Sequence, residues 1–116
     1  MGFGLSELRE ILEERKKSNP ETSYVASLYS KGMDKILEKV GEEATETILA
    51  AKNYKDSSAD AKIQKKTELV NETADLWFHS MVMLSYLNIS HDEVLQILKH
   101  RSGISGHKEK AGRNSD

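Results

Sequence analysis

Apolar residues recur along most of this chain at the three- and four-residue spacing that is typical of amphipathic helices. The first run of this pattern predicts a helix over about residues 6–17, with Ser6 as its N-cap. A shorter run predicts a helix over 24–30 that ends at Gly32, a residue that suits a left-handed backbone conformation. Polar and turn-forming residues, including an Asn-Pro pair, separate these two segments.

Two longer helices are expected over about 34–53 and 61–87, with a loop rich in Asp and Ser between them. The second of them is apolar nearly all round from Leu76 to Leu87, Trp77 included, which is typical of a helix surrounded by others. One small domain has few elements with which to cover such a helix, so we expect a homodimer to complete the bundle. The apolar stripe of the first long helix consists of Ile36, Val40, Ala44, Thr47, Ile48 and Ala51.

A capping box at Ser90 and Glu93 opens a last helix that reaches about Arg101. The residues expected to face inward on this helix are Val94, Ile97 and Leu98. Residues 1–103 are therefore expected to form a single helical domain. The remaining segment, 104–116, is polar with little to bury, so we expect a mobile tail.

Composition supports an all-α fold, a bundle of four to five helices in 116 residues. The chain is 37% hydrophobic and 31% charged with one Pro, and no strand pattern stands out. A net charge of -2 leaves no large basic surface for nucleic acid, and no apolar run reaches the roughly 18 residues of a membrane-spanning helix. The absence of Cys excludes a disulfide framework and thiolate-bound zinc. No signal-sequence pattern opens the chain, so we expect a cytoplasmic protein without nucleic-acid or membrane partners.

Two acidic clusters interrupt the apolar faces of the long helices, Glu42-Glu43-x-x-Glu46 and Glu72-x-x-Asp75. Carboxylates three or four positions apart share a helix face, and Glu43 falls inside the apolar stripe of its helix. If the two helices pack together, four or five carboxylates converge, and their charges repel unless a cation joins them. Oxygen ligands alone suit Mg²⁺, Mn²⁺ or Ca²⁺, and Mg²⁺ leaves positions for water and substrate phosphates. The pattern therefore predicts a metal site that acts on a phosphate ester or anhydride.

Other interpretations of these residues stay open at this point. An acid-rich helix face is often only solvated, and a di-iron centre would need Glu-x-x-His on two helices, whereas His79 follows Asp75 by four positions. His79 either orients a carboxylate or is a core histidine with satisfied hydrogen bonds. Lys39 either contacts phosphate or forms an ion pair with a neighbouring Glu. Arg101 either complements the helix C-terminus or clamps a phosphate.

The order and spacing of several motifs resemble those of the phosphoribosyl-ATP pyrophosphatases, within the all-α, MazG-like superfamily of nucleoside triphosphate pyrophosphohydrolases. The resemblance covers about residues 5–101. It implies hydrolysis of 1-(5-phosphoribosyl)-ATP to 1-(5-phosphoribosyl)-AMP and pyrophosphate in histidine biosynthesis, dependence on one or two Mg²⁺ ions, and a homodimer. The motifs that carry it are Ser23-Tyr24, Lys39-Val40-Gly41-Glu42-Glu43, and Ala74-Asp75-Leu76 followed by His79.

The resemblance and the acidic pattern together assign roles to individual residues. The expected metal ligands are Glu43, Glu46, Glu72 and Asp75. The expected catalytic residues are Glu42, Glu43 and Glu46, with Glu42 either a further ligand or the base that orients the attacking water. The expected substrate contacts are Lys39, Ser23, Tyr24, Arg101 and His79. The alternatives are a house-cleaning nucleotide pyrophosphatase, a di-iron oxidase, and a non-enzymatic helical module for metal binding or dimerisation.

Overall fold

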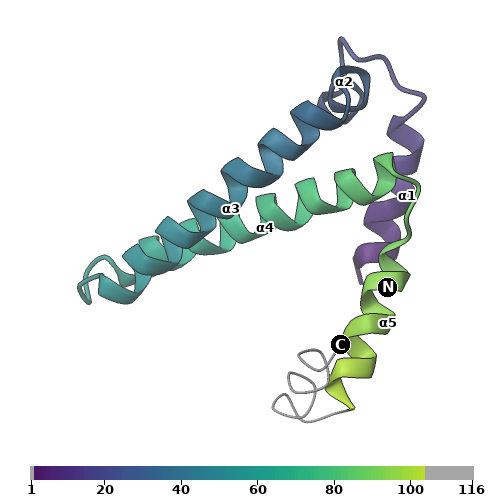
Figure 1. The fold of residues 1–116 in the computed structure, drawn as a ribbon. Helices are drawn as coiled ribbons and strands as arrows, with labels where there is room; N and C mark the ends of the chain where they lie inside the picture. Colours follow the sequence, from purple (N-terminus) through teal and green to yellow (C-terminus); the bar gives the residue numbers. More distant parts are fainter. Residues whose placement is uncertain (1, 104–116) are drawn as a thin grey trace.

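A computed structural model describes residues 2–103, and over this range the chain is all-α (Figure 1). The prediction of an all-α fold is therefore confirmed, and the described residues contain no strand. The predicted tail, 104–116, lies outside the described residues. The five helices are α1 (Leu5–Arg15), α2 (Tyr24–Lys31), α3 (Met33–Asp56), α4 (Lys62–Tyr86) and α5 (His91–Ser102).

Local hydrogen bonds explain where most of these helices begin. The backbone N–H of Gly4 donates to Oε1 of Glu7 at 2.9 Å, so α1 is capped at Gly4 and the prediction of Ser6 as its N-cap was wrong. The hydroxyl of Ser23 caps α2 by accepting from the N–H of Ala26 at 3.2 Å. The expected cap at Ser90 is confirmed, with its hydroxyl accepting from the N–H of Asp92 at 3.1 Å.

Gly32 separates α2 from α3 with a φ of 93° and a ψ of -171°, a conformation open essentially to glycine alone. The chain turns there without a longer loop, and α3 begins at the next residue. The stop predicted at Gly32 is thus confirmed. A side chain at this position would be strained whatever space surrounds it.

Helices α3 and α4 form a long antiparallel hairpin that dominates the molecule (Figure 1). Each has roughly seven turns, and α3 continues to Asp56, beyond its predicted end at Asn53. The short helix α2 packs against α3, whereas α1 packs against α4 and α2 at one end of the hairpin. Helix α5 packs on α1 and runs away from the hairpin (Figure 1).

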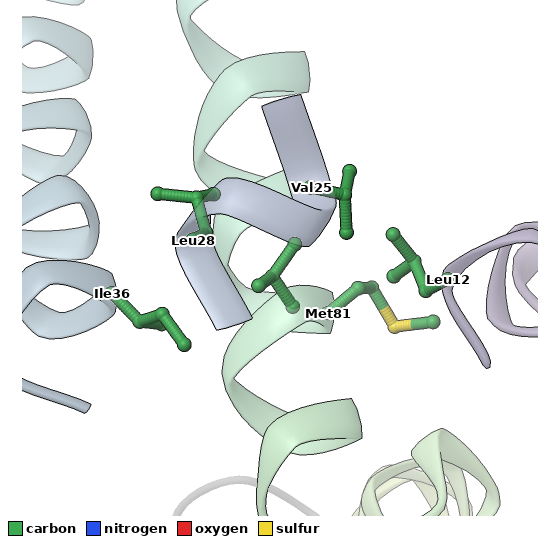
Figure 2. Packing of buried hydrophobic residues seen from close by; sticks show 6 residues of the cluster. Leu12, Val25, Leu28, Ile36 and Met81 are labelled. Carbon is green, nitrogen blue, oxygen red and sulfur yellow. The ribbon is translucent and has the colours of Figure 1, made fainter. Parts of the chain in front are cut away.

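The hydrophobic core lies at the end of the hairpin where α1 and α2 meet it. Side chains from four helices converge there, as Figure 2 shows for Leu12 of α1, Leu28 of α2, Ile36 of α3 and Met81 of α4. Leu12 and Ile36 are completely buried, and burying an aliphatic side chain of this size contributes about 1.5–3 kcal/mol. The core therefore anchors one end of the hairpin, while the rest of α3 and α4 depends mainly on contacts between these two helices.

A buried polar network fixes α1 and α2 on α4 beside this core. The hydroxyl of Ser85 donates to Oε2 of Glu13 at 2.5 Å, and this bond lowers the pKa of Glu13. The hydroxyl of Tyr29 donates to Oγ of Ser85 at 2.9 Å, and its oxygen lies 3.2 Å from the carbonyl oxygen of Leu12. Ser85 is almost fully buried, so its hydrogen bonds offset the cost of placing a hydroxyl inside the protein.

Several predictions of inward-facing apolar residues were wrong for the single chain. Trp77 is 62% exposed, and the three inward residues predicted for α5 are all exposed. On α3 the buried position near the end of the predicted stripe is Ala50, whereas Ile48 and Ala51 are exposed. The helical periodicity was correct, but it does not say whether the same chain covers the apolar face.

Candidate active site

Three carboxylates converge in the middle of the hairpin. Glu43 and Glu46 of α3 and Glu72 of α4 each place one oxygen within 4.8 Å of the oxygens of the other two. Glu43 and Glu46 lie three positions apart and so share one face of α3. The antiparallel packing of α4 brings Glu72 against that face. We call these three residues the acid group.

A threonine holds the two helices in register beside the acid group. The hydroxyl of Thr47 is 2.7 Å from the carbonyl oxygen of Glu43 in its own helix and 3.1 Å from that of Glu72 in α4. A hydroxyl has one hydrogen, which these two acceptors share. The contact ties the backbone of one acid to the backbone of another and limits sliding of one helix along the other.

The acid group is buried in part and incompletely hydrogen-bonded. Glu43 is only 6% exposed, which confirms the prediction that it faces inward. Oε2 of Glu43 and Oε2 of Glu72 are buried, and neither has a hydrogen-bond partner among the described residues. Leaving a carboxylate oxygen buried without a partner destabilises the fold unless something else binds it.

The crowding of negative charge in the acid group also shifts the pKa values of two of its members. Burial, and then the charges of Glu46 and Asp75, raise the pKa of Glu43 above its ordinary value. A hydrogen bond with Glu46, followed by burial and the neighbouring charges, raises the pKa of Glu72 to about 7. In the absence of a cation, Glu43 and Glu72 thus hold their protons to a higher pH than isolated glutamates would.

This donor set fits a hard divalent cation. All three candidate ligands offer carboxylate oxygens, which suit Mg²⁺, Mn²⁺ or Ca²⁺, and two of these oxygens are buried without a hydrogen-bond partner within residues 2–103. A hollow of about 410 Å³ between α3 and α4 opens beside Glu46 and Glu72. It is also lined by Asn53, Lys65 and Glu68, which were not among the predicted site residues. For the two residues on α4 a signal was available, because Lys65, Glu68 and Glu72 follow one another at i, i+3, i+7 along one face of the helix.

Asp75 and Glu42, the other predicted acids, are exposed and lie outside the acid group. Asp75 is near enough for its charge to raise the pKa of both Glu43 and Glu72. Glu42 forms an ion pair with Lys39, with 2.9 Å between Oε2 and Nζ. A hydrogen bond from Lys39 lowers the pKa of Glu42, and the same bond raises the pKa of Lys39. The ion pair and the phosphate contact predicted for Lys39 therefore compete for the same ammonium group.

His79 is 5% exposed, and both of its ring nitrogens have partners. Nδ1 lies 2.9 Å from the backbone carbonyl oxygen of Asp75, which can only accept, so Nδ1 carries the proton. Nε2 then accepts from the hydroxyl of Tyr24 at 2.8 Å. Neither bond goes to a carboxylate side chain, so His79 orients Tyr24. Ser23, next to Tyr24, is occupied as the cap of α2.

Among the predicted substrate contacts, Arg101 lies apart from Lys39, Ser23, Tyr24 and His79 in the single chain. It lies in the last turn of α5, which packs on α1 and runs away from the hairpin (Figure 1). The fold therefore brings Glu43, Glu46 and Glu72 together, holds Tyr24 and His79 in contact, and does not bring Arg101 to the acid group of its own chain.

The fold and the site define a class of proteins in which a helical hairpin carries converging carboxylates suited to a divalent cation. No helix within residues 2–103 combines the length and the apolarity that crossing a bilayer would require. The family model for phosphoribosyl-ATP pyrophosphohydrolase matches residues 5–102, and the chain belongs to this family. A phosphoribosyl-ATP pyrophosphatase from Hydrogenovibrio crunogenus is 51% identical over 112 residues, which cover 97% of this chain and 94% of that protein.

These comparisons confirm the family that the sequence motifs indicated. They make the chain an enzyme of the hydrolase class, which removes the di-iron oxidase and the non-enzymatic module from the alternatives.

Proposed function

We propose that this protein hydrolyses 1-(5-phosphoribosyl)-ATP to 1-(5-phosphoribosyl)-AMP and pyrophosphate, the second step of histidine biosynthesis, with Mg²⁺ as the required ion. Family membership and the name of the relative support the substrate. The observation that carries the proposal is the acid group, in which two buried carboxylate oxygens have no partner among the described residues. We expect the reaction to take place in the cytoplasm.

The residues that would hold one or two Mg²⁺ ions are Glu43, Glu46 and Glu72, with Asp75 as the fourth ligand. When bound, Mg²⁺ neutralises polyphosphate charge and lowers the pKa of a coordinated water. The raised pKa values of Glu43 and Glu72 fit this assignment, because each carboxylate gains more from a nearby cation than an isolated glutamate would. Asp75 is exposed and free to turn toward the ion.

The remaining polar residues complete the chemistry around the α–β phosphate anhydride. In the reaction, a water oxygen bonds to one phosphorus while the bridging P–O bond breaks and pyrophosphate leaves. Glu42, whose pKa is lowered by Lys39, stays ionised at neutral pH and can accept the proton of that water. Lys39 then exchanges its ion pair with Glu42 for a phosphate oxygen.

A homodimer is part of the same proposal. The hairpin and α5 leave large apolar side chains in solvent. Their number is larger than expected for the single, scattered apolar residues of an ordinary protein surface. Ile63 is 82% exposed and Trp77 62%, and the exposed apolar positions of α5 form one face of that helix. A second copy that covers these faces would turn two hairpins into a bundle. Light scattering of the purified protein at micromolar concentration should give twice the chain mass, and a well-folded monomer would contradict this part of the proposal.

The experiment that tests the function is a substrate panel. Pyrophosphate release is measured from phosphoribosyl-ATP, ATP and dUTP, each with Mg²⁺ and with EDTA. We expect release from phosphoribosyl-ATP with Mg²⁺ and little from the other two nucleotides. Faster release from dUTP would instead identify a house-cleaning pyrophosphatase, and equal rates in EDTA would refute the role of the metal.

A further inference from the structure

A second hollow, of about 480 Å³, lies beside Tyr24 where the end of α1 approaches the start of α2. Its lining combines one guanidinium, several hydroxyls and two aromatic rings. The residues that matter here are Arg15, Ser18, Thr22, Tyr24 and Phe78. Arg15 and Phe78 have no role in the metal site described above.

The polar groups of this hollow are available to a ligand. Arg15 is exposed, and its guanidinium makes no ion pair or hydrogen bond with any described residue. The hydroxyl of Ser18 is likewise without a partner within residues 2–103. Thr22 donates to the carbonyl oxygen of Asn19 at 3.3 Å and keeps its acceptor positions. A cation beside hydroxyl donors suits a phosphate, which a guanidinium binds through two parallel hydrogen bonds.

The hollow adjoins the acid group along α4. Tyr24 lines the hollow and is linked through His79 to the backbone of Asp75 by hydrogen bonds of 2.8 Å and 2.9 Å. Phe78 follows Asp75 by three positions and Glu72 by six, which corresponds to rises of about 4.5 Å and about 9 Å along the helix. Figure 1 shows α1 and α2 together at this end of the hairpin. Along α4 the hollow therefore lies within about two helical turns of the acid group.

The acid group and the hollow offer the chemistry that the two ends of phosphoribosyl-ATP require. That molecule carries a triphosphate at one end, adenine in the middle, and a second ribose with its own 5′-phosphate at the other end. The acid group offers carboxylates for a metal and polyphosphate, and the hollow offers the rings of Phe78 and Tyr24 together with the guanidinium of Arg15. Aromatic rings pack against a base or sugar, and the guanidinium supplies the charge for the far phosphate.

We propose, on the basis of the proposed function, that this hollow binds the phosphoribosyl end of the substrate and that Arg15 contacts its 5′-phosphate. Ser18 and Thr22 supply hydroxyls to the same phosphate or ribose. Arg15 is then a specificity-determining residue, because ATP and dUTP have no second phosphate to place there. Enzymes reject an analogue most strongly when it leaves a polar group of the site without its partner.

The test compares Arg15→Gln with Lys17→Gln, a matched loss of charge in the segment that follows α1. Lys17 is exposed and does not line the hollow. For Arg15→Gln, kcat/KM with phosphoribosyl-ATP should fall by about 10- to 100-fold, mainly through KM, as for the loss of a charged hydrogen bond. Inhibition by phosphoribosyl-AMP should weaken by a similar factor, whereas inhibition by AMP should not change. Lys17→Gln should behave like the wild type, and Arg15→Lys should recover part of the loss.

Two results would overturn the inference. One is an Arg15→Gln enzyme with wild-type kinetics and wild-type inhibition by phosphoribosyl-AMP. The other is an equal loss of inhibition by AMP and by phosphoribosyl-AMP, which would show that Arg15 does not read the second phosphate. Thermal unfolding of the variants checks that the fold is intact, and Arg15→Lys keeps the comparison possible if Arg15→Gln unfolds. Failure of the proposed function looks different, because the wild type itself would then release no pyrophosphate from phosphoribosyl-ATP.

Discussion

Replacing Glu43 by Gln should have opposite effects on stability and on activity. Glu43 is buried, its Oε2 has no partner among the described residues, and the charges of Glu46 and Asp75 add to burial in raising its pKa. Two unit charges 4.8 Å apart, the limit of separation within the acid group, repel by about 3.5 kcal/mol at an effective dielectric constant of about 20. The raised pKa values of Glu43 and Glu72 mean that protonation already relieves part of this repulsion.

We therefore expect the Glu43→Gln protein, in EDTA, to gain about 1–2 kcal/mol in free energy of unfolding. With Mg²⁺ and phosphoribosyl-ATP, its kcat/KM should fall at least about 100-fold, because a metal ligand is lost. Urea denaturation and a pyrophosphate-release assay measure the two quantities on the same samples. Glu38→Gln is the matched control, since Glu38 lies on α3 in an exposed ion pair with Lys35, and it should leave both quantities nearly unchanged.

A Glu43→Gln protein that is less stable than the wild type in EDTA would mean that the carboxylate stabilises the fold through its own contacts. Wild-type kinetics in that variant would remove Glu43 from the site. Either result would contradict the proposed role of Glu43, because both its raised pKa and its role as a metal ligand follow from the same crowding of negative charge.

The remaining predictions concern the rest of the site and the core. Asp75→Asn should lower kcat/KM for pyrophosphate release at least about tenfold; a wild-type rate would exclude Asp75 as a ligand. Lys39→Ala should raise KM or lower kcat/KM while Mn²⁺ titration shows unchanged metal binding; unaltered kinetics would leave Lys39 with its ion pair alone. In EDTA, the free energy of unfolding measured in urea should fall as pH rises from 4.5 to about 7. Folded Glu72, with its pKa raised to about 7, holds a proton over this range that the unfolded chain releases. A free energy of unfolding that increases with pH over this range would contradict the raised pKa. Leu28→Ala should cost about 2–5 kcal/mol of stability, and a cost below about 1 kcal/mol would show that Leu28 is not central to the core.

The sequence pattern was sufficient for the helices and for the position of Glu43. Helical periodicity depends on the spacing of apolar residues within one segment, so an acid inside an apolar stripe can be recognised without knowing the fold. The predicted positions of helix ends were less accurate. At the start of α1, Ser6 has a side chain typical of an N-cap, but the helix is capped at Gly4, whose backbone N–H donates to the carboxylate of Glu7.

The distinction between covered and uncovered apolar faces could not be read from the pattern. Trp77 and the apolar residues of α5 follow the same spacing as the core residues, yet they are exposed in the single chain. Contacts between distant segments were also beyond the pattern. The pairing of Tyr24 with His79 and the approach of Arg15 to Phe78 depend on how α1 and α2 pack on α4.

The most direct test of the proposed metal site is to locate a divalent ion in the protein. A crystal grown with Mn²⁺ and phosphoribosyl-AMP is measured at a wavelength where manganese scatters anomalously. We predict an anomalous peak within bonding distance of carboxylate oxygens of Glu43, Glu46 and Glu72. Full occupancy of Mn²⁺ elsewhere on the chain, with these three carboxylates bound to nothing, would contradict it.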